Sequence, residues 1–531
     1  MYLSLLLLST LLRVATSARV PNSPLPTPSR GLNASTLLFY LSQDGLSPSD
    51  ELTLATLQGA LTRLGAPRIY RAASGSDYAD LWAPGLSDVW QVSLDNTTFA
   101  GVWDAVAFFN RSVTTYVIAN TSDGSVNAAV ALCSAYVAIA ITADNEARAI
   151  AAGLGRLADV RGRDLAWVLA NVGTDKFSSR VTLIQSPSKT GMSDWAIAGN
   201  ALPWYVPDAT TGLATQIWDA MTPPFFALGW GPDERGTVSS ASSAGGGVIA
   251  TDWAQNLDAL SAFDVPGLSQ KPTFEPPRAR SGTHTAAFLM SDGDNVQWLL
   301  GGFARSSNFY ASPDRGRVPM GWTISPSLVD LAPVAMKYFY DNAADGVTSS
   351  CRDVFVAGLS GAAYSYVDLD DAGRGFSEKI NLTLAYAAKA GLEYQNVMTN
   401  GDTLALNIAT AYLAPPSPLA GLFHYSYDDY ALGGAITFIG DKPVIQARFN
   451  LWGDGTMGKN FLNVQQAAAA LVKAGRDPTV ADGYSLIVVH AWTHNVSDAR
   501  EVMDIVNSQT AGVNFVAPDE LAALVAANVK R

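Results

Sequence analysis

The sequence is poor in cysteine, histidine and charged side chains. Its 531 residues include only two cysteines and four histidines, and 15% of the residues are charged. Two cysteines, Cys133 and Cys351, are too few for a disulfide scaffold, so the fold must rest on buried apolar surface. We expect both to be buried free thiols, although an oxidising compartment would also allow them to pair.

Runs of lysine or arginine are absent as well. The formal net charge is −13 and the sequence pI is about 4.7. Because nucleic acids and anionic membranes attract positive charge, this balance predicts no nucleic-acid partner and disfavours anionic membrane surfaces. The negative charge of the protein would neither attract nor repel a neutral ligand. At 531 residues, the chain is long enough for two or three domains, and its 48% of hydrophobic residues can supply each of them with a sizeable core.

Long hydrophobic runs are missing after the first eighteen residues. Residues 1–18 hold a short apolar core, at Leu5–Leu8 and Leu11–Leu12, followed by small residues up to Ala18. This pattern predicts a secretory signal peptide cleaved near Ala18, and the lack of a basic residue before the apolar core leaves an uncleaved anchor as the alternative. No later stretch has the length and apolarity of a membrane span.

Six Asn-x-Ser/Thr sequons are consistent with passage through a secretory route. They begin at Asn33, Asn96, Asn110, Asn120, Asn381 and Asn495. We therefore expect a secreted, extracellular glycoprotein that has no membrane partner once the signal is removed.

Apolar runs alternate with amphipathic stretches between residues 37 and 252. Candidate strands are Leu37–Leu41, Val89–Val92, Thr115–Ala119, Tyr136–Ile141, Trp167–Val172, Val181–Ile184, Phe225–Trp230 and Gly247–Asp252. Helical spacing is found between them, for example in Asp50–Leu64 and Asn145–Leu157. This alternation predicts an α/β domain with a mainly parallel sheet, which we assign to residues 19–270.

Four prolines between Pro266 and Ser281 indicate a linker. Eight candidate strands follow it, at Thr285–Met290, Met320–Ile324, Val354–Gly358, Gln395–Thr399, Gly421–Tyr425, Val444–Phe449, Leu486–His490 and Val513–Val516. Eight strands in this length predict a (β/α) barrel over residues 271–531. A seven-stranded barrel is the alternative, because the first two connections are irregular.

Two carboxylates directly follow the first of these strands, in Ser291-Asp292-Gly293-Asp294-Asn295. The glycine between them is expected to let the chain turn sharply where it leaves the sheet. Barrels carry their chemistry at the carboxyl ends of the strands, where close carboxylates shift each other's pKa or share a cation. Both outcomes favour hydrolysis.

Several segments of the chain resemble the GxGYxYP family, which is assigned to the glycoside hydrolases. The matching segments are Thr56–Gly59, Arg68–Tyr70, Ser291–Asn295, Gly321–Pro326 and Gly361–Val367, and they occur in the family's order. In the last segment, which names the family, Ala363 replaces the second glycine and Val367 the proline. Both tyrosines remain. The resemblance covers nearly the whole mature chain and implies hydrolysis of a carbohydrate substrate, without naming the reaction.

Glycosidases place two carboxyl groups about 5 to 5.5 Å apart for retention or about 6.5 to 9.5 Å apart for inversion. Asp292 and Asp294 leave one strand in different directions, so we expect the second acid to come from another strand. Asp428 is the first candidate, ahead of Asp429 and Asp402. Aromatic and polar side chains near strand ends are expected to bind the sugar. They are Asn295, Tyr364, Tyr366, Trp452, His490 and Trp492.

Two alternatives stay open. Asp294, His490 and His494 would suit a divalent metal that activates water, as in a polysaccharide deacetylase, whereas the glycosidase needs no cofactor. A non-catalytic glycan-binding protein would keep the aromatic side chains without a competent acid pair.

Overall fold

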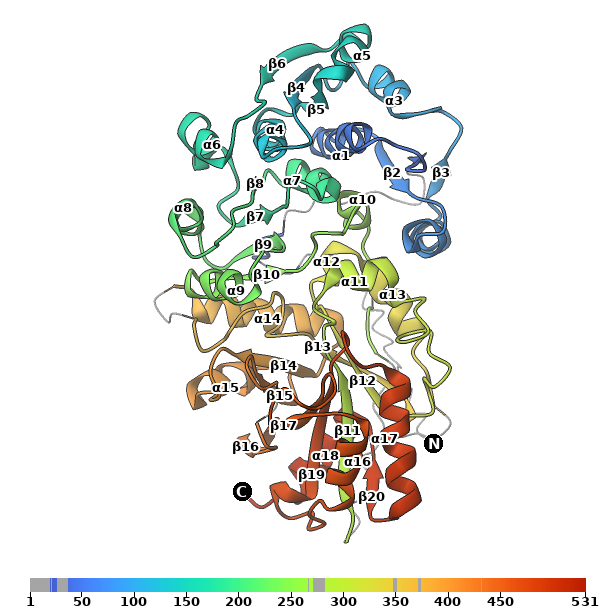
Figure 1. The fold of residues 1–531 in the computed structure, drawn as a ribbon, viewed down its shortest axis with the longest axis vertical. Helices are drawn as coiled ribbons and strands as arrows, with labels where there is room; N and C mark the ends of the chain where they lie inside the picture. Colours follow the sequence, from blue (N-terminus) through green and yellow to red (C-terminus); the bar gives the residue numbers. More distant parts are fainter. Residues whose placement is uncertain are drawn as a thin grey trace, which may run out of the picture.

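The computed structural model describes residues 20, 22–25, 37–265, 267–270, 282–346, 351–370, 374–430 and 432–531. The predicted signal peptide and the sequon at Asn33 lie outside these residues. The described part is elongated, with the N-terminal sheets at one end and the C-terminal barrel at the other (Figure 1). Within it, no helix combines the length and apolarity needed to cross a membrane.

Three small parallel sheets form the N-terminal part. The first, in the order β2-β1-β3, contains β1 (Leu37–Ser42), β2 (Arg68–Ala72) and β3 (Ser93–Asp95). The second, in the order β5-β4-β6, contains β4 (Thr115–Ala119), β5 (Ile139–Thr142) and β6 (Gly155–Asp159). The third, in the order β10-β9-β7-β8, contains β7 (Val181–Ile184), β8 (Leu202–Trp204), β9 (Phe225–Gly229) and β10 (Gly246–Ile249). The predicted parallel pairing is confirmed, but it is divided among three sheets.

Helices pack around these sheets, and α1 is buried along most of its length. Ser47 caps its first turn by accepting a hydrogen bond from the Asp50 backbone N–H, and Pro48 occupies the first helical position. The other helices are α2 (Ala83–Trp90), α3 (Val102–Phe108), α4 (Ser125–Tyr136), α5 (Glu146–Ala151), α6 (Leu165–Asn171), α7 (Ser193–Ala198), α8 (Gly212–Ala220), α9 (Glu234–Ser243) and α10 (Leu257–Leu260). Helix α1 itself spans Pro48–Arg63.

Two predicted strands are helical. Trp167–Val172 falls on α6, where the Asp164 side chain caps the helix by accepting from the Trp167 N–H. Val89–Val92 covers the end of α2, which stops at Gln91 with φ 55° before β3 begins. Short apolar runs do not distinguish a strand from a half-buried helix by periodicity alone.

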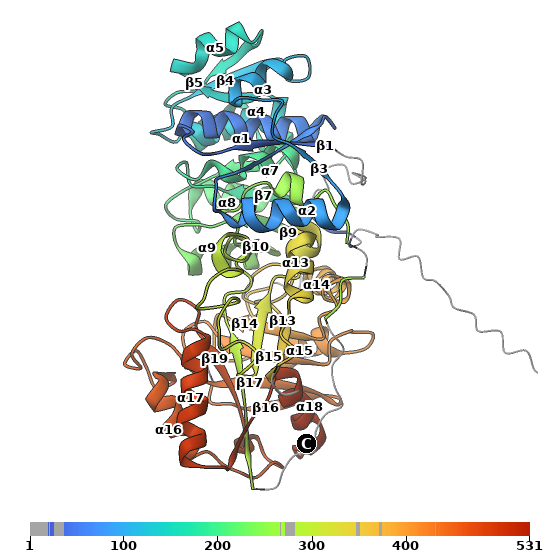
Figure 2. The same ribbon diagram turned by 90° about the vertical axis from the view of Figure 1, so that its right-hand side faces the viewer.

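The C-terminal part is a closed barrel of seven parallel strands. They are β11 (His284–Met290), β12 (Met320–Ile324), β13 (Asp353–Ala357), β14 (Tyr394–Thr399), β15 (Gly421–Ser426), β17 (Lys442–Leu451) and β19 (Tyr484–Val489). The ring closes because β11 pairs with both β19 and β12. Figure 2 shows the strands at the centre of this part, with helices around them.

The eighth predicted strand exists but does not complete an eight-stranded ring. Strand β20 (Val513–Phe515) pairs with β11 only at His284–Ala286, whereas β12 pairs with β11 directly at Phe288–Met290. Because β20 is only three residues long, it pairs with the amino-terminal half of β11 and leaves the carboxyl-terminal half free to pair with β12. The seven-stranded alternative is therefore the correct one.

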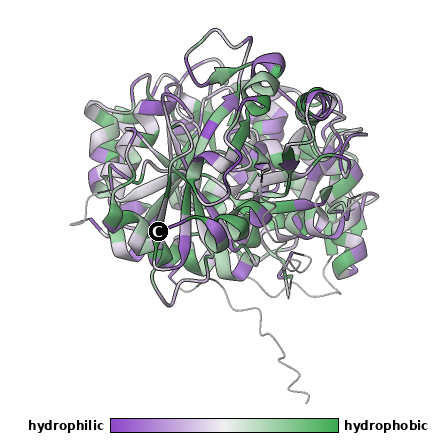
Figure 3. Cartoon of the chain, turned by 90° about the horizontal axis from the view of Figure 1, so that it is seen from below, coloured by the Kyte–Doolittle hydropathy of each residue, from purple (hydrophilic) through white to green (hydrophobic). Residues whose placement is uncertain are grey.

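Helices and two short strands surround the barrel. The helices are α11 (Val296–Trp298), α12 (Leu328–Leu331), α13 (Pro333–Asp341), α14 (Phe376–Ala390), α15 (Leu406–Leu413), α16 (Val464–Val472), α17 (Val496–Gln509) and α18 (Pro518–Asn528). The strands β16 (Ile436–Ile439) and β18 (Phe461–Leu462) pair with β17. Seen from the barrel end, hydrophilic and hydrophobic residues are interspersed over these elements (Figure 3).

Both cysteines are free thiols, but only one is buried. Cys133 lies inside α4, where burial raises the pKa of its thiol far above the ordinary range. Cys351 is partly exposed, just before β13. None of the five described sequon asparagines is buried.

Candidate functional site

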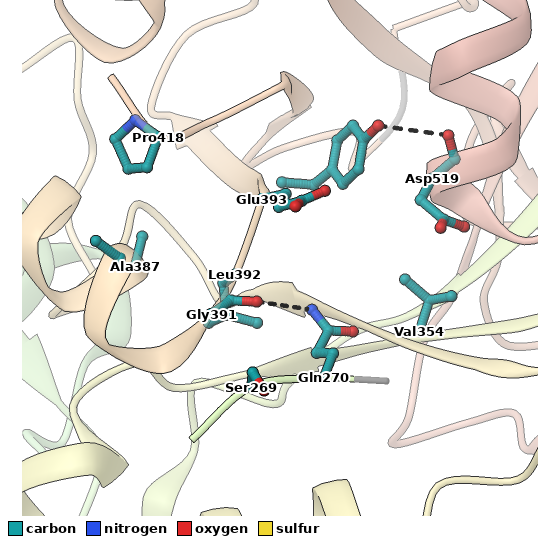
Figure 4. Close-up of a pocket in the computed structure, with 11 residues that line it drawn as sticks. Ser269, Gln270, Val354, Ala387, Gly391, Leu392, Glu393, Pro418 and Asp519 are labelled. Carbon is teal, nitrogen blue, oxygen red and sulfur yellow. Dashed lines mark hydrogen bonds between the residues drawn. The ribbon is translucent and has the colours of Figure 1, made fainter. Parts of the chain in front are cut away.

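One sizeable cavity lies away from the predicted site residues. It measures about 480 Å³ and borders the amino ends of β13 and β14, at Val354 and Tyr394 (Figure 4). Gln270 donates a hydrogen bond to the Gly391 carbonyl there, and Asp519 forms an ion pair with Arg352. Because barrel proteins place their chemistry at the carboxyl ends of the strands, this cavity is a poor candidate.

A second cavity, of about 200 Å³, lies where the carboxyl ends of two parallel sheets face each other. The N-terminal sheet β10-β9-β7-β8 contributes residues that follow its strands, namely Lys189, Trp230, Glu234, Asp252 and Trp253. The barrel contributes Asp292, Asp294, Asn295, Gln297, Leu359, Tyr364, Tyr430 and Trp492. Ligand sites of α/β proteins form at such carboxyl edges. Apart from Asp252, which forms an ion pair with Lys189, three carboxyl groups share this pocket: Glu234, Asp292 and Asp294.

The turn after β11 holds both predicted aspartates in this pocket. Asp292, not the glycine, takes the left-handed conformation, with φ 67°. Gly293 is needed for a different reason: a Cβ there would lie 1.6 Å from the Thr323 carbonyl oxygen. Its N–H donates to the Thr323 hydroxyl at 2.8 Å. The strained Asp292 backbone is thus fixed by the close contact of its neighbour with β12.

Asp294 is the most deeply buried of the three acids. Burial raises the pKa of Asp294 well above its ordinary value, and the charges of Asp292 and Glu234 add to this effect. Its Oδ1 atom has no hydrogen-bond partner within the described residues. Burial and the neighbouring charges therefore favour the protonated, neutral form of the Asp294 carboxyl group.

Glu234 is an acid of the pocket that the sequence did not single out. It is the first residue of α9, just after the Asp233 side chain that caps the helix. Burial, with a smaller contribution from the charge of Asp292, raises the pKa of Glu234 to about 7. A pKa near neutrality suits a general acid. The signal was present in the sequence, because Glu234 follows the predicted strand Phe225–Trp230 as closely as the other candidates follow theirs.

Tyr364 connects the barrel to the N-terminal sheet. Its hydroxyl donates to Glu234 Oε1 at 3.0 Å, and its backbone exchanges two hydrogen bonds of 2.8 Å with Val248 of β10. A Cβ at Gly247 would lie 2.8 Å from the Ala363 methyl group, so the two backbones are in close contact. In Figures 1 and 2, α9 and β10 accordingly lie directly beside the barrel. The loop Gly361–Val367 therefore brings the barrel and the N-terminal sheet together at the acidic pocket.

Three other predicted sugar-binding residues support the pocket without lining it. Tyr366 is buried with its ring edge-on to Tyr364, at a centroid distance of 5.6 Å. His490 lies with Nε2 4.0 Å from Asp292 Oδ2, and burial lowers the pKa of His490. Trp452 stacks on the His490 ring at 3.5 Å. Trp452 therefore holds the His490 ring, which faces Asp292.

Of the remaining candidates, Asn295 and Trp492 line the pocket. Trp492 is 56% exposed and packs against Trp298, whereas Trp253 on the N-terminal side is 63% exposed. Tyr430, which the sequence analysis did not select, completes the lining from the loop after β15. Two exposed aromatic side chains, Trp253 from the N-terminal sheet and Trp492 from the barrel, thus line the pocket.

Asp428 does not line the pocket. Its side chain is 61% exposed and forms an ion pair with Arg235, with Nη1 2.9 Å from Oδ1. Arg235 also donates to the Asn400 side chain, so barrel loops hold the residue next to Glu234. Asp428 therefore contacts the helix that bears an acid and is not itself placed against a substrate.

The predicted metal ligands Asp294, His490 and His494 do not form a common site. His494 is bonded through Nδ1 to Asp498 and through Nε2 to the Gly453 carbonyl, and it lies outside the pocket. Across the described residues, no three His, Cys, Asp or Glu side chains are placed to hold a metal ion. The set Asp294, His490 and His494 therefore does not fit a divalent metal.

These features define an α/β protein whose seven-stranded barrel carries acidic side chains at its carboxyl end. Residues 282–526 match the family model described as "GxGYxYP putative glycoside hydrolase C-terminal domain". Residues 179–262 match "GxGYxYP third domain", and residues 113–176 match "GxGYxYP_N second domain". The chain belongs to the GxGYxYP family, as its motifs predicted.

One solved structure is similar along almost the whole chain. It is described as "a putative hydrolase from Bacteroides thetaiotaomicron VPI-5482" and superposes with a TM-score of 0.84 at 27% sequence identity. The similarity covers 96% of this chain and 98% of that one. No curated protein matches the chain.

Proposed function

We propose that the chain is a glycoside hydrolase in which Glu234 is the general acid and Asp292 its carboxylate partner. The observation that carries this proposal is the convergence of Glu234, Asp292 and Asp294 on one pocket, with the pKa of Glu234 near 7. An acid that is protonated at working pH and a second carboxylate are what glycosidic bond cleavage needs.

The chemistry follows from these positions. As the bond between the anomeric carbon and the glycosidic oxygen breaks, the Glu234 proton passes to that oxygen, so the leaving group departs as an alcohol. The Asp292 carboxylate either bonds to the anomeric carbon or takes a proton from the water that attacks it. In the first case, water then attacks the anomeric carbon while Glu234 takes its proton, and the bond to Asp292 breaks, which releases the sugar and restores both carboxyl groups. Both routes end with the same hydrolysed bond.

Asp294 has a different part in this scheme. Because it keeps its proton, it is a poor base and a poor nucleophile, but it can donate a hydrogen bond to a sugar hydroxyl. Its unpartnered Oδ1 atom can accept one. We assign Asp294 to substrate binding, together with Asn295 and Tyr430.

The test is a screen of the purified protein against aryl glycosides and natural oligosaccharides, with and without EDTA. We expect hydrolysis of at least one sugar class, insensitivity to EDTA, and loss of turnover in Glu234→Gln and Asp292→Asn with binding retained. Asp428→Asn is the matched control, because Asp428 is an acid outside the pocket. Loss of activity with EDTA and recovery with zinc would support the deacetylase instead, and unchanged glycan binding without any turnover would support a non-catalytic binder.

We further propose that the protein is secreted. The support is the apolar segment before Ala18 and the accessible sequon asparagines. Expression of the full chain in a eukaryotic secretory host would test it. N-terminal sequencing should find the mature chain starting near Arg19 in the medium, and retention in the cell membrane would contradict the proposal.

A further inference from the structure

We infer that the pocket accepts a single terminal sugar ring, so that the enzyme releases monosaccharides from chain ends. This inference rests on the proposed glycosidase function and adds to it the part of the substrate that is recognised. Three observations carry it: the size of the cavity, its buried floor and its aromatic rim.

The cavity is small for a carbohydrate site. Its volume of about 200 Å³ lies below the range of roughly 300 to 1,000 Å³ that holds drug-sized ligands. One pyranose ring suits such a space, whereas several consecutive rings need a longer groove. The N-terminal sheet accounts for this small size. The loops that follow β7, β9 and β10 lie against the carboxyl end of the barrel, where an open groove would otherwise run.

The floor of the pocket is buried and polar. Asp294, Tyr364 and Tyr430 line it, and each is less than 9% exposed. Burial raises the pKa of both tyrosines well above 10, so both hydroxyls stay protonated. A ring that enters the pocket therefore meets hydroxyl and carboxyl groups at its inner end. This arrangement recognises the hydroxyls of a terminal sugar.

The rim is aromatic and open. Trp253 is supplied by the loop after β10 and Trp492 by the loop after β19, and both are more than half exposed. Each is held by a neighbour: the Lys189 Nζ atom lies 4.4 Å from the Trp253 ring centroid, and the Trp298 centroid lies 5.5 Å from that of Trp492. Exposed rings held in place at a pocket mouth suit stacking against the next sugar along the chain. The scissile bond would then lie between the pocket and this rim.

Product analysis tests the inference. Linear oligosaccharides of the sugar class that the screen identifies, labelled at the reducing end, are digested by the full chain and sampled from the earliest times. We expect a free monosaccharide and labelled products shortened one unit at a time. A substrate whose non-reducing terminal sugar carries a bulky substituent should resist. Labelled products that have lost several sugar units at once at the earliest times would overturn this inference alone. The absence of hydrolysis of any glycan would overturn the proposed function as well.

The rim is tested with Trp253→Ala and Trp492→Ala. Each should raise KM for an oligosaccharide about tenfold while leaving KM for the corresponding methyl glycoside unchanged, since a methyl group does not reach the rim. Tyr136→Ala, which removes a half-exposed ring at the end of α4, is the control and should change neither. Equal effects on the two substrates would show that the tryptophans contact the terminal ring itself and would contradict their assignment to the next sugar.

Discussion

The Tyr364 hydroxyl donates a 3.0 Å hydrogen bond to Glu234 across the junction between the barrel and the N-terminal sheet. The tyrosine follows β13, and the glutamate begins α9. Because the same tyrosine pairs its backbone with Val248, a single residue both joins the two sheets and, through its hydroxyl, lowers the pKa of the proposed acid.

Glu234→Gln should abolish most turnover. Loss of a general acid typically lowers the rate by about 100-fold to 10,000-fold, and the neutral amide preserves the shape of the side chain. The measurement is kcat on a natural oligosaccharide together with Kd from calorimetry, where we expect kcat to fall and Kd to stay within about threefold. Asp428→Asn should keep kcat within about threefold, since it removes an exposed ion pair. A larger loss in Asp428→Asn than in Glu234→Gln would refute the assignment.

Tyr364→Phe should move the basic limb of the pH–rate profile to higher pH. The tyrosine hydrogen bond favours the ionised form of Glu234 and so lowers the pKa of Glu234. Removing it raises that pKa, and the protonated acid persists to higher pH, by about one pH unit. Tyr340→Phe deletes a comparable buried hydrogen bond, to the Ala390 carbonyl, away from the pocket and should leave the limb in place. A limb that moves to lower pH in Tyr364→Phe contradicts the mechanism.

Asp294→Asn should stabilise the protein increasingly as the pH rises. The folded-state pKa of Asp294 lies above the unfolded value of about 3.9, so the folded state binds more protons. Its contribution to the free energy of unfolding is therefore fully present below about pH 4 and is lost as the pH rises toward the folded-state pKa. Asparagine does not ionise and avoids this loss. Differences in thermal midpoint between variant and wild type, measured from about pH 4 to pH 8, should grow with pH.

Asp95→Asn supplies a control of opposite sign for that measurement. Hydrogen bonds from Thr98 and Thr97 lower the pKa of Asp95 to about 2, so its stabilising contribution is present above the unfolded pKa and is lost as the pH falls. When the series is extended to lower pH, the Asp95→Asn variant should therefore lose stability relative to wild type as the pH rises from about 2 to about 4, and the difference should change little above that range. A pH-independent difference for Asp294→Asn would show that Asp294 is ionised in the folded protein.

Gly293→Ala should destabilise the fold by about 3 kcal/mol, because its Cβ would overlap the Thr323 carbonyl oxygen and push β11 and β12 apart. Activity should fall as well, since Asp292 and Asp294 flank the displaced residue. Gly124→Ala is the matched control: no atom lies within 4 Å of a Cβ there, and its φ of −65° suits alanine. Thermal unfolding followed by circular dichroism compares the two, and equal midpoints would mean that the turn relaxes freely.

The barrel was predictable because its strands are buried on both faces and therefore appear as continuous apolar runs. All eight predicted strands exist, from β11 to β20. The number of strands in the ring was not fixed by these runs. This number depends on whether β20 or β12 pairs with the carboxyl-terminal half of β11. Pairing between strands far apart in the sequence leaves no periodic signal in the sequence. Trp167–Val172 was mispredicted for the related reason that a short half-buried helix resembles a strand.

The site was predictable only in its barrel half. Asp292 and Asp294 follow a strand at once and are flanked by glycine, so their position at the carboxyl end could be inferred from the sequence. Glu234 obeys the same rule in the other sheet, but nothing in the sequence indicates that this sheet turns its carboxyl edge toward the barrel. Asp428 was selected on the same rule, and its partner Arg235 draws it away from the pocket.

Because the two sheets meet edge to edge, the proposed proton donor, Glu234, and its proposed partner, Asp292, belong to segments on either side of the predicted linker. The isolated barrel would keep both aspartates and lack Glu234, and the isolated N-terminal part would keep Glu234 without a partner. Changes in loop length on either side can thus reshape the entrance while the acids stay in place, which gives this architecture two independent routes to a new substrate preference.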